Sequence, residues 1–181
     1  CDAHGVPLVH YSTDYVFGGE PRRTPYPIDH PPAPINAYGR SKRVGERHLL
    51  ASPGPHLLVR TSWLYAPWGT SFVRTMARLA RTRDALRVVD DQRGRPTSAE
   101  ALARLSLALL AQGRRGVFHG ADAGTCTWYQ LARAVVAHVR PACRVEPCTS
   151  AEMPRPAPRP AYSVLDLART EAALGPLTPW R

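Results

Sequence analysis

The chain has 181 residues, 44% of them hydrophobic and 21% charged, and a formal net charge of +10. This composition predicts one globular domain with a buried core, and no segment approaches the ~20 consecutive apolar residues that span a membrane. The arginines are scattered, with no run longer than two, so we expect the charge to favour anionic ligands such as nucleotides and not nucleic acid.

The predicted strands and helices alternate along the chain, which is typical of an α/β fold with a mostly parallel sheet. Short apolar runs predict the strands, and apolar stripes at helical spacing predict the helices. In chain order, we expect a strand at residues 8–11, a helix at 36–50, a strand at 56–63, a helix at 71–83, a strand at 86–89, a helix at 97–113, a strand at 116–119 and a helix at 127–140.

Polar residues mark where several of these helices begin. Asn36 has the side chain of an N-terminal cap. Residues 97–100 and 127–130 fit the capping-box pattern, with Thr97 and Thr127 as the caps. The proline- and arginine-rich residues 153–160 could serve as a ligand for an SH3-type domain, but we favour a surface loop.

The four cysteines show neither a CxxC pair nor zinc-type spacing with the histidines. We therefore interpret them as reduced thiols of a cytoplasmic protein and expect no metal site. They are Cys1, Cys126, Cys143 and Cys148.

The chain contains a single lysine, Lys42, four residues after Tyr38. On a helix this spacing places both side chains on one face, about 6 Å apart at Cβ. A cation at that position favours the phenolate, so such a tyrosine can donate or accept a proton near neutral pH. Tyrosine–lysine pairs at this spacing are common by chance, and the motif alone is weak evidence.

A second feature strengthens this interpretation, because the polar group Ser12-Thr13-Asp14 ends the first predicted strand. Open α/β sheets bind ligands at the carboxyl ends of their strands. A helix beside this strand can bring Tyr38 and Lys42 to Thr13. A hydroxyl, a phenol and an ammonium at one site suit the reduction of a carbonyl group.

Five motifs, in order over nearly the whole chain, resemble the dTDP-4-dehydrorhamnose reductase family of extended short-chain dehydrogenases/reductases. They are STDYVF at 12–17, NAYGRSK at 36–42, RTSWLYA at 60–66, DDQRGRPT at 90–97 and RPAYSVLD at 159–166. The resemblance implies reduction by NADPH or NADH of the 4-keto group of dTDP-4-dehydro-6-deoxy-L-mannose. The product would be dTDP-L-rhamnose, used in cell-surface polysaccharide biosynthesis.

The resemblance also implies roles for individual residues. The catalytic residues would be Thr13, Tyr38 and Lys42. Cofactor contacts would come from Tyr38, Lys42 and Ser12. Substrate contacts would come from Asp14, Tyr15, Trp63, Gln92 and Arg159, with Gly94 and Pro96 shaping the substrate side.

Each substrate contact has a simpler alternative that the sequence leaves open. Trp63 can place an aromatic face on a deoxysugar or fill the core at a strand end. Asp14 and Tyr15 can belong to strand-end turn chemistry. Arg159 can bind a diphosphate through its bidentate fork or remain a solvated loop arginine.

Two departures from the family pattern affect these expectations. Ser71 stands where the family usually has asparagine before the phenylalanine, so one substrate contact is weakened. The chain also lacks the glycine-rich turn that binds a dinucleotide pyrophosphate. We therefore expect an incomplete Rossmann-type sheet, its second half, in a fragment lacking about 90 N-terminal residues.

The expected division of the chain follows from this interpretation. Residues 1–66 would complete the dinucleotide-binding domain. Residues 67–181 would form a smaller substrate-binding region, interleaved with strands that return to the sheet at about 86–122, and would end before a last helix. The fragment alone is expected to be inactive.

Two alternatives remain open. One is a related ketoreductase acting on another nucleotide-linked deoxysugar. The other is a non-catalytic regulatory subunit resembling the β-subunit of methionine adenosyltransferase, although such a subunit has no need for all three catalytic residues. A homodimer is compatible with the resemblance, and neither a nucleic-acid nor a membrane partner is expected.

Overall fold

The computed structural model describes the backbone of residues 1–181 and every side chain except that of Asp2. The helices are α1 (Ala37–Ala51), α2 (Phe72–Thr82), α3 (Ala99–Ala111), α4 (Trp128–Val139) and α5 (Ala168–Leu174), with short 3-10 turns η1 (Asp2–His4) and η2 (Asp14–Val16). The strands are β1 (Leu8–Thr13), β2 (His56–Thr61), β3 (Leu64–Tyr65), β4 (Ala85–Val89), β5 (Arg93–Gly94), β6 (Thr97–Ser98), β7 (Gly116–His119), β8 (Cys126–Thr127) and β9 (Arg144–Cys148). No helix in the described part of the chain is long and apolar enough to cross a membrane.

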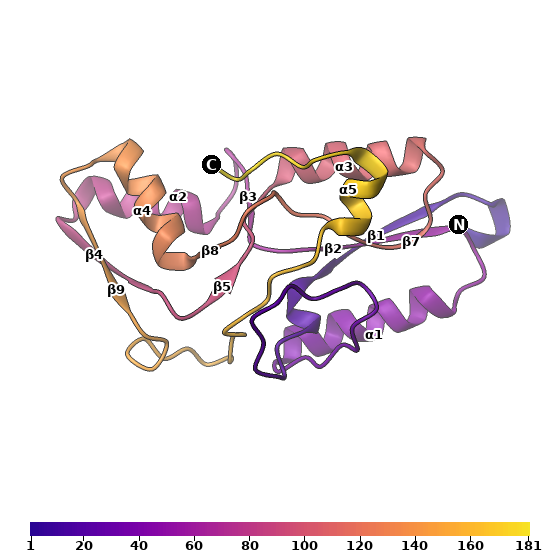
Figure 1. Ribbon diagram of the computed structural model, residues 1–181, viewed down its shortest axis with the longest axis horizontal. Coiled ribbons are helices and arrows are strands. Elements are labelled where there is room, and N and C mark those ends of the chain that lie inside the picture. The colour runs from indigo at the N-terminus through magenta and orange to yellow at the C-terminus, as the bar shows by residue number, and fades with distance from the viewer.

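Strands β1, β2 and β7 form a parallel sheet in that order. Helix α1 packs against β1 and β2 on one face, while α3 and α5 lie on the other (Figure 1). We call these six elements the sheet region. The register pairs Thr13 with Thr61, so β1 and β2 end side by side. The core residues are Leu57, Val59, Leu102, Leu105, Leu109 and Phe118.

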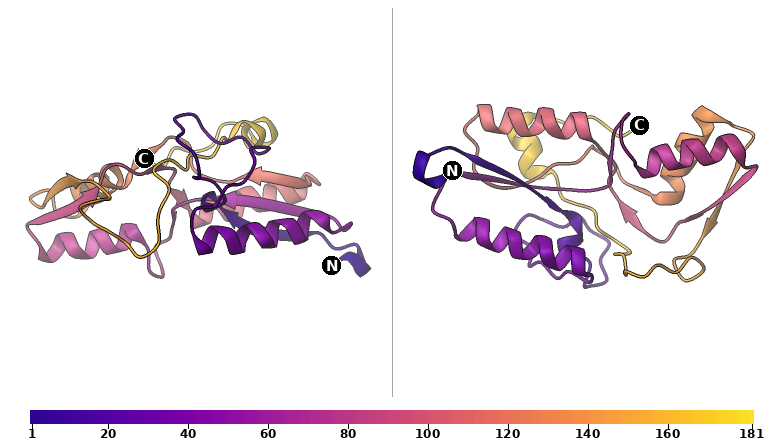
Figure 2. Two further views of the ribbon diagram at one scale, coloured as in Figure 1. Left: turned by 90° about the horizontal axis from the view of Figure 1, so that it is seen from below. Right: turned by 180° about the vertical axis from the view of Figure 1, so that it is seen from behind.

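Helices α2 and α4 pack against a second parallel pair, β4 and β9. We call these four elements the paired-helix region. Its apolar core consists of Met76, Ala80, Leu86, Val88, Ala132, Val136 and Cys143. Figures 1 and 2 show the two regions at opposite ends of an elongated molecule.

The helix starts largely follow the sequence-based expectation. Asn36 caps α1 by accepting a hydrogen bond from the Gly39 N–H at 2.8 Å. Thr127 and Gln130 form the expected capping box of α4. The expectation for α3 was wrong by one residue, because Ser98 is the cap and Thr97 belongs to β6. The Thr-x-x-Glu pattern is local and does not show that Thr97 pairs with β3.

The strands between residues 86 and 122 do not all return to the main sheet. β7 pairs there, whereas β4 pairs with β9 in the paired-helix region. β9 contains Pro147, which lacks an N–H and is therefore tolerated only at the edge of a sheet. The division at residue 66 stays a prediction.

Residues 160–167, which we call the return segment, run back to the sheet region. Tyr162 bridges to Arg93, and Leu165 bridges to Tyr26. Val164 and Leu165 are completely buried. The segment therefore forms part of the core, although it belongs to no named helix or strand.

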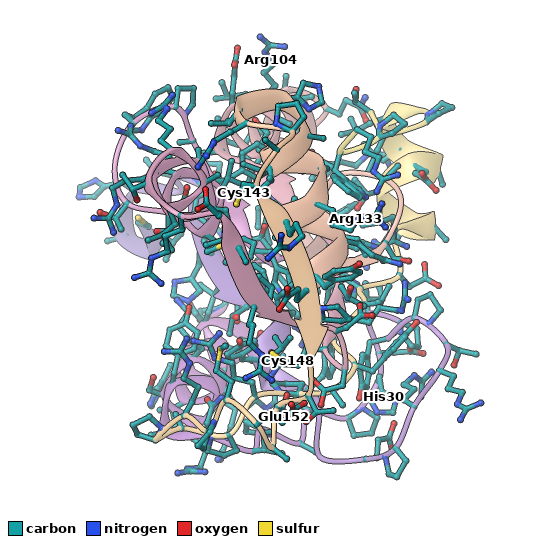
Figure 3. All side chains as sticks on the ribbon, turned by 90° about the vertical axis from the view of Figure 1, so that its left-hand side faces the viewer. His30, Arg104, Arg133, Cys143, Cys148 and Glu152 are labelled. Carbon is teal, nitrogen blue, oxygen red and sulfur yellow. The ribbon has the colours of Figure 1, made fainter. Side chains whose placement is uncertain are left out.

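Three cysteines are buried free thiols, and Cys1 is exposed. Cys143 and Cys148 lie toward opposite ends of β9 (Figure 3). A strand of this length separates them by about 16 Å, beyond the reach of a disulfide. Burial raises the pKa of Cys126 to about 12. A thiol with so high a pKa is a packing residue and a poor nucleophile.

Candidate active site

A cavity of about 590 Å³ lies where the two regions meet, at the carboxyl ends of β1 and β2 and the first turns of α1. The sheet region provides most of its polar lining, and α2 and α4 provide aromatic side chains. The lining residues are Tyr11, Ser12, Thr13, Asp14, Tyr15, Tyr38, Lys42, Thr61, Ser62, Trp63, Leu64, Phe72, Trp128, Arg155 and Arg159.

Thr13 lies at the point where β1 turns into η2. Its Oγ1 caps this turn by accepting a hydrogen bond from the Tyr15 N–H at 3.2 Å. The same hydroxyl donates to Asp14 Oδ1 at 3.1 Å. Its immediate chain neighbours therefore hold the buried Thr13 hydroxyl in the cavity wall.

Tyr38 reaches the cavity because α1 begins unusually close to η2. A Cβ on Gly39 would lie 2.1 Å from the Tyr15 carbonyl oxygen, so only glycine allows this approach. The Tyr38 ring then meets the Tyr15 ring edge-on, with centroids 6.1 Å apart. Its side chain remains 55% exposed, which leaves the phenol accessible to a ligand.

Lys42 follows one turn later on the same face of α1. Its Nζ donates a hydrogen bond to the Tyr11 carbonyl oxygen at 2.6 Å. This bond holds the ammonium at the end of β1, and an ammonium has further donors for a ligand. The helix spacing and the strand end therefore bring Thr13, Tyr38 and Lys42 to one cavity.

Asp14 points away from water and is fully enclosed. Burial raises its pKa to about 7, against the opposing effect of hydrogen bonds from Ser163, Thr13 and backbone N–H groups. Ser163 Oγ donates to Asp14 Oδ2 at 2.6 Å, from the return segment. A carboxyl in this state changes charge near neutral pH.

Tyr15 lines the cavity next to Asp14 in the chain. Burial and the nearby Asp14 charge raise the Tyr15 pKa to about 12, while Arg159 acts in the opposite direction. Tyr15 therefore stays protonated and can act as a hydrogen-bond donor.

Trp63 lines the cavity in a strained backbone conformation, with φ at 47°. Its indole stacks on Trp128 at a centroid distance of 3.6 Å. A Cβ on Gly94 would lie 2.5 Å from Trp63 Cε2 and slightly farther from both neighbouring ring atoms, which places Gly94 over the other face. Both faces are thus covered, so Trp63 presents its edge to the cavity.

The two other predicted substrate contacts have different positions. Arg159 lines the cavity from the exposed loop before the return segment. Gln92 is buried outside the lining, where its side-chain amide donates to Ser150 Oγ at 2.8 Å. Gly94 supports the cavity indirectly through Trp63.

Several residues that line the cavity were not predicted from the sequence. Trp128 and Phe72 were assigned only to helices, and Arg155 only to a loop, because their approach to the cavity depends on long-range packing. Ser163 lay within a quoted motif, but nothing local marked it as a partner of Asp14.

One polar group in the cavity wall is left for a ligand to satisfy. The hydroxyl of Thr61 lines it, is buried, and has no hydrogen-bond partner among the described residues. Such a group costs free energy unless a ligand or water satisfies it. Together with the remaining donors of the Lys42 ammonium, it offers polar groups beside Thr13 that a ligand can bind.

A parallel α/β sheet with threonine, tyrosine and lysine gathered at its strand ends defines a Rossmann-like protein of the short-chain dehydrogenase/reductase type. Comparison with known families agrees: the model described as "RmlD substrate binding domain" matches residues 1–181. The chain belongs to this family.

Individual relatives are similar over nearly the whole chain. A probable dTDP-4,6-dihydroxy-2-methyloxan-3-one 4-ketoreductase of Streptomyces antibioticus is 48% identical, covering 98% of this chain and 60% of that protein. A dTDP-4-dehydrorhamnose reductase of Mycolicibacterium smegmatis is 44% identical, covering 100% and 57%. The crystal structure of the Bacillus anthracis dTDP-4-dehydrorhamnose reductase with NADP is 36% identical, with a TM-score of 0.91, covering 99% and 64%. The chain thus spans less than two thirds of each relative.

Proposed function

We propose that the full-length gene product carrying residues 1–181 reduces the 4-keto group of dTDP-4-dehydro-6-deoxy-L-mannose with NADPH or NADH. The observation that carries this proposal is the meeting of Thr13, Tyr38 and Lys42 in one cavity with Trp63 and Arg159. The activities for which the relatives are named support reduction of a dTDP-linked keto sugar. A non-catalytic binding role does not account for the intact catalytic group.

The bound dinucleotide supplies the hydride that reduces the carbonyl carbon. Tyr38 transfers its phenolic proton to the carbonyl oxygen, and the Lys42 ammonium stabilises the phenolate that remains. Thr13 orients the carbonyl oxygen by hydrogen bonding. Lys42 and Ser12 would also contact the cofactor, as the resemblance implies.

The remaining lining residues would bind the rest of the substrate. Arg159 has the geometry to meet a diphosphate, and Tyr15 can donate to a sugar oxygen. Residues 1–66 would serve the dinucleotide side, and residues 67–181 the sugar side. A reaction that consumes NADPH and a nucleotide sugar favours a cytoplasmic location.

Replacing Tyr38 with phenylalanine tests the proposal directly. We expect Tyr38→Phe to lower kcat at least about 100-fold, with little change in substrate affinity, because only the proton donor is lost. The assay follows NADPH oxidation by the full-length gene product with the keto sugar. Tyr129→Phe, outside the cavity, is the control.

The outcomes separate the reaction from the substrate. Near-normal turnover by Tyr38→Phe would remove this tyrosine as the proton donor. Turnover of a different dTDP-linked keto sugar alone would change the substrate but keep the reaction.

A further inference from the structure

A chain of hydrogen bonds links Thr13 to a residue 150 positions later in the sequence. Ser163 donates to one oxygen of Asp14 at 2.6 Å, and Thr13 donates to the other at 3.1 Å. The exposed fractions of Ser163, Asp14 and Thr13 are 2%, 2% and 5%, so water cannot substitute freely for these bonds. The protonation of Asp14 therefore has consequences for Thr13.

An ionised Asp14 is purely an acceptor, and both hydroxyls must donate to it. Thr13 has only one hydrogen to donate. When that hydrogen points at Asp14, the Thr13 hydroxyl has none left for a substrate carbonyl. It can then only accept hydrogen bonds, which does not help a carbonyl oxygen.

A neutral Asp14 reverses this arrangement. Its own O–H can donate to Thr13 Oγ1, which already accepts from the Tyr15 N–H. These two bonds occupy both acceptor positions of the hydroxyl. The Thr13 hydrogen is then free to point into the cavity.

We propose that Asp14 and Ser163 are positioning residues that set the direction in which Thr13 donates its hydrogen. Neutral Asp14 directs the Thr13 hydrogen toward the substrate carbonyl, and ionised Asp14 withdraws it. Ser163, in the return segment, donates a hydrogen bond to Asp14 and so favours the ionised state over the neutral one. This inference rests on the proposed function, in which Thr13 binds the carbonyl oxygen.

The groups around Asp14 place the change between its neutral and ionised states near neutral pH. Burial raises the Asp14 pKa to about 7, and the bonds from Ser163 and Thr13 oppose that effect. The other titratable groups of the cavity wall are Tyr11, Tyr15, Tyr38, Lys42, Arg155 and Arg159. As pH rises through the Asp14 pKa, the share of neutral Asp14 falls, and with it the share of Thr13 able to donate.

The first test needs no catalytic activity. Carboxyl carbon-13 NMR of the aspartate-labelled full-length gene product measures the titration midpoint of Asp14, assigned with Asp14→Asn. We expect Ser163→Ala and Thr13→Val each to raise this midpoint by about one pH unit, because each removes a donor to the carboxylate. Ser163→Thr retains a donor and should titrate like the wild type.

A matched control separates this effect from general loosening of the core. Thr170→Val removes another buried side-chain hydroxyl, which donates to the His119 carbonyl oxygen outside the cavity, and should leave the Asp14 midpoint unchanged. An unchanged or lowered midpoint in Ser163→Ala would overturn the proposal. Equal shifts in Ser163→Ala and Thr170→Val would do the same.

The second test measures the pH dependence of kcat in the full-length gene product. We expect kcat of the wild type to fall about tenfold per unit above the Asp14 midpoint and Ser163→Ala to hold its plateau to higher pH. Asp14→Asn can donate to Thr13 from its amide at every pH, so this fall should disappear. An unchanged fall in Asp14→Asn would overturn the proposal, whereas absence of turnover in the wild type would refute only the proposed function.

Discussion

The two regions of the molecule differ in what they bury. The sheet region encloses charged and titratable groups: Glu46 and His119 are fully buried, and Arg60 is 2% exposed. The Arg60 guanidinium binds both Glu46 oxygens, at 2.8 and 3.0 Å. The paired-helix region has an aliphatic core, and its ion pairs, such as Arg140 with Asp84, lie on the surface.

This difference corresponds to the two kinds of wall around the cavity. Buried ion pairs and hydrogen bonds fix donor directions, although they contribute little net stability. Apolar and aromatic packing fixes shape. The cavity lies between the two regions, with Tyr38 and Lys42 on the sheet side and Phe72 and Trp128 on the other.

The largest expected effect comes from breaking the buried ion pair. Arg60→Leu should lower the free energy of unfolding by about 3–5 kcal/mol, because it leaves Glu46 charged and enclosed. Urea denaturation measures the loss. Arg104→Leu breaks an exposed pair with Glu100 and should cost less than about 1 kcal/mol. Equal losses would erase the contrast between buried and surface charge.

A second effect concerns His119, whose pKa burial lowers to about 4. The unfolded chain binds a proton below about 6.5, and the folded protein does so only near 4. His119 therefore makes stability fall as pH drops from about 6.5 to 4, by up to about 3 kcal/mol. His119→Gln should remove this dependence in urea titrations, and an unchanged pH slope would contradict it.

The aromatic contact between the regions is the next to test. Gly94→Ala would force a methyl group into the Trp63 indole, which cannot retreat because Trp128 covers its other face. We expect a loss of about 1–3 kcal/mol in thermal or urea unfolding. Gly45→Ala, on α1 with only ordinary contacts, should instead stabilise by about 0.5–1 kcal/mol. Destabilisation of both would point to a general intolerance of glycine replacement.

The smallest effect is expected at Ser71, where the family usually has asparagine. Ser71 caps α2 by accepting a hydrogen bond from the Arg74 N–H. Asparagine caps equally well, so Ser71→Asn should change stability by less than about 0.5 kcal/mol. A lower KM for the keto sugar in this variant would support a lost substrate contact, and an unchanged KM would argue against one.

The local sequence pattern predicted the order of strands and helices along the chain well and the packing between these elements poorly. Alternating apolar runs indicated β1, β2, β4 and β7, and capping residues indicated α1 and α4. Helix α5 was not predicted, because Leu167 precedes it and provides no side-chain cap. Strand β9 was not predicted, because Pro147 interrupts its apolar pattern.

The same limit applies to the cavity. Tyr38 and Lys42 were predictable because helix spacing alone places them together, and Thr13 because it ends a strand. Ser163 and Trp128 were not, since each meets its partner only through contacts between residues far apart in the sequence. The covered faces of Trp63 likewise depend on the close approach of Gly94, which no local signal reveals.

The stacked indoles of Trp63 and Trp128 have an optical consequence. Two chromophores 3.6 Å apart and 10° from parallel share their excited states and quench each other's emission. Only four tryptophans occur in the chain. Circular dichroism therefore carries a contribution from this junction, and loss of the exciton signal marks the separation of Trp63 from Trp128.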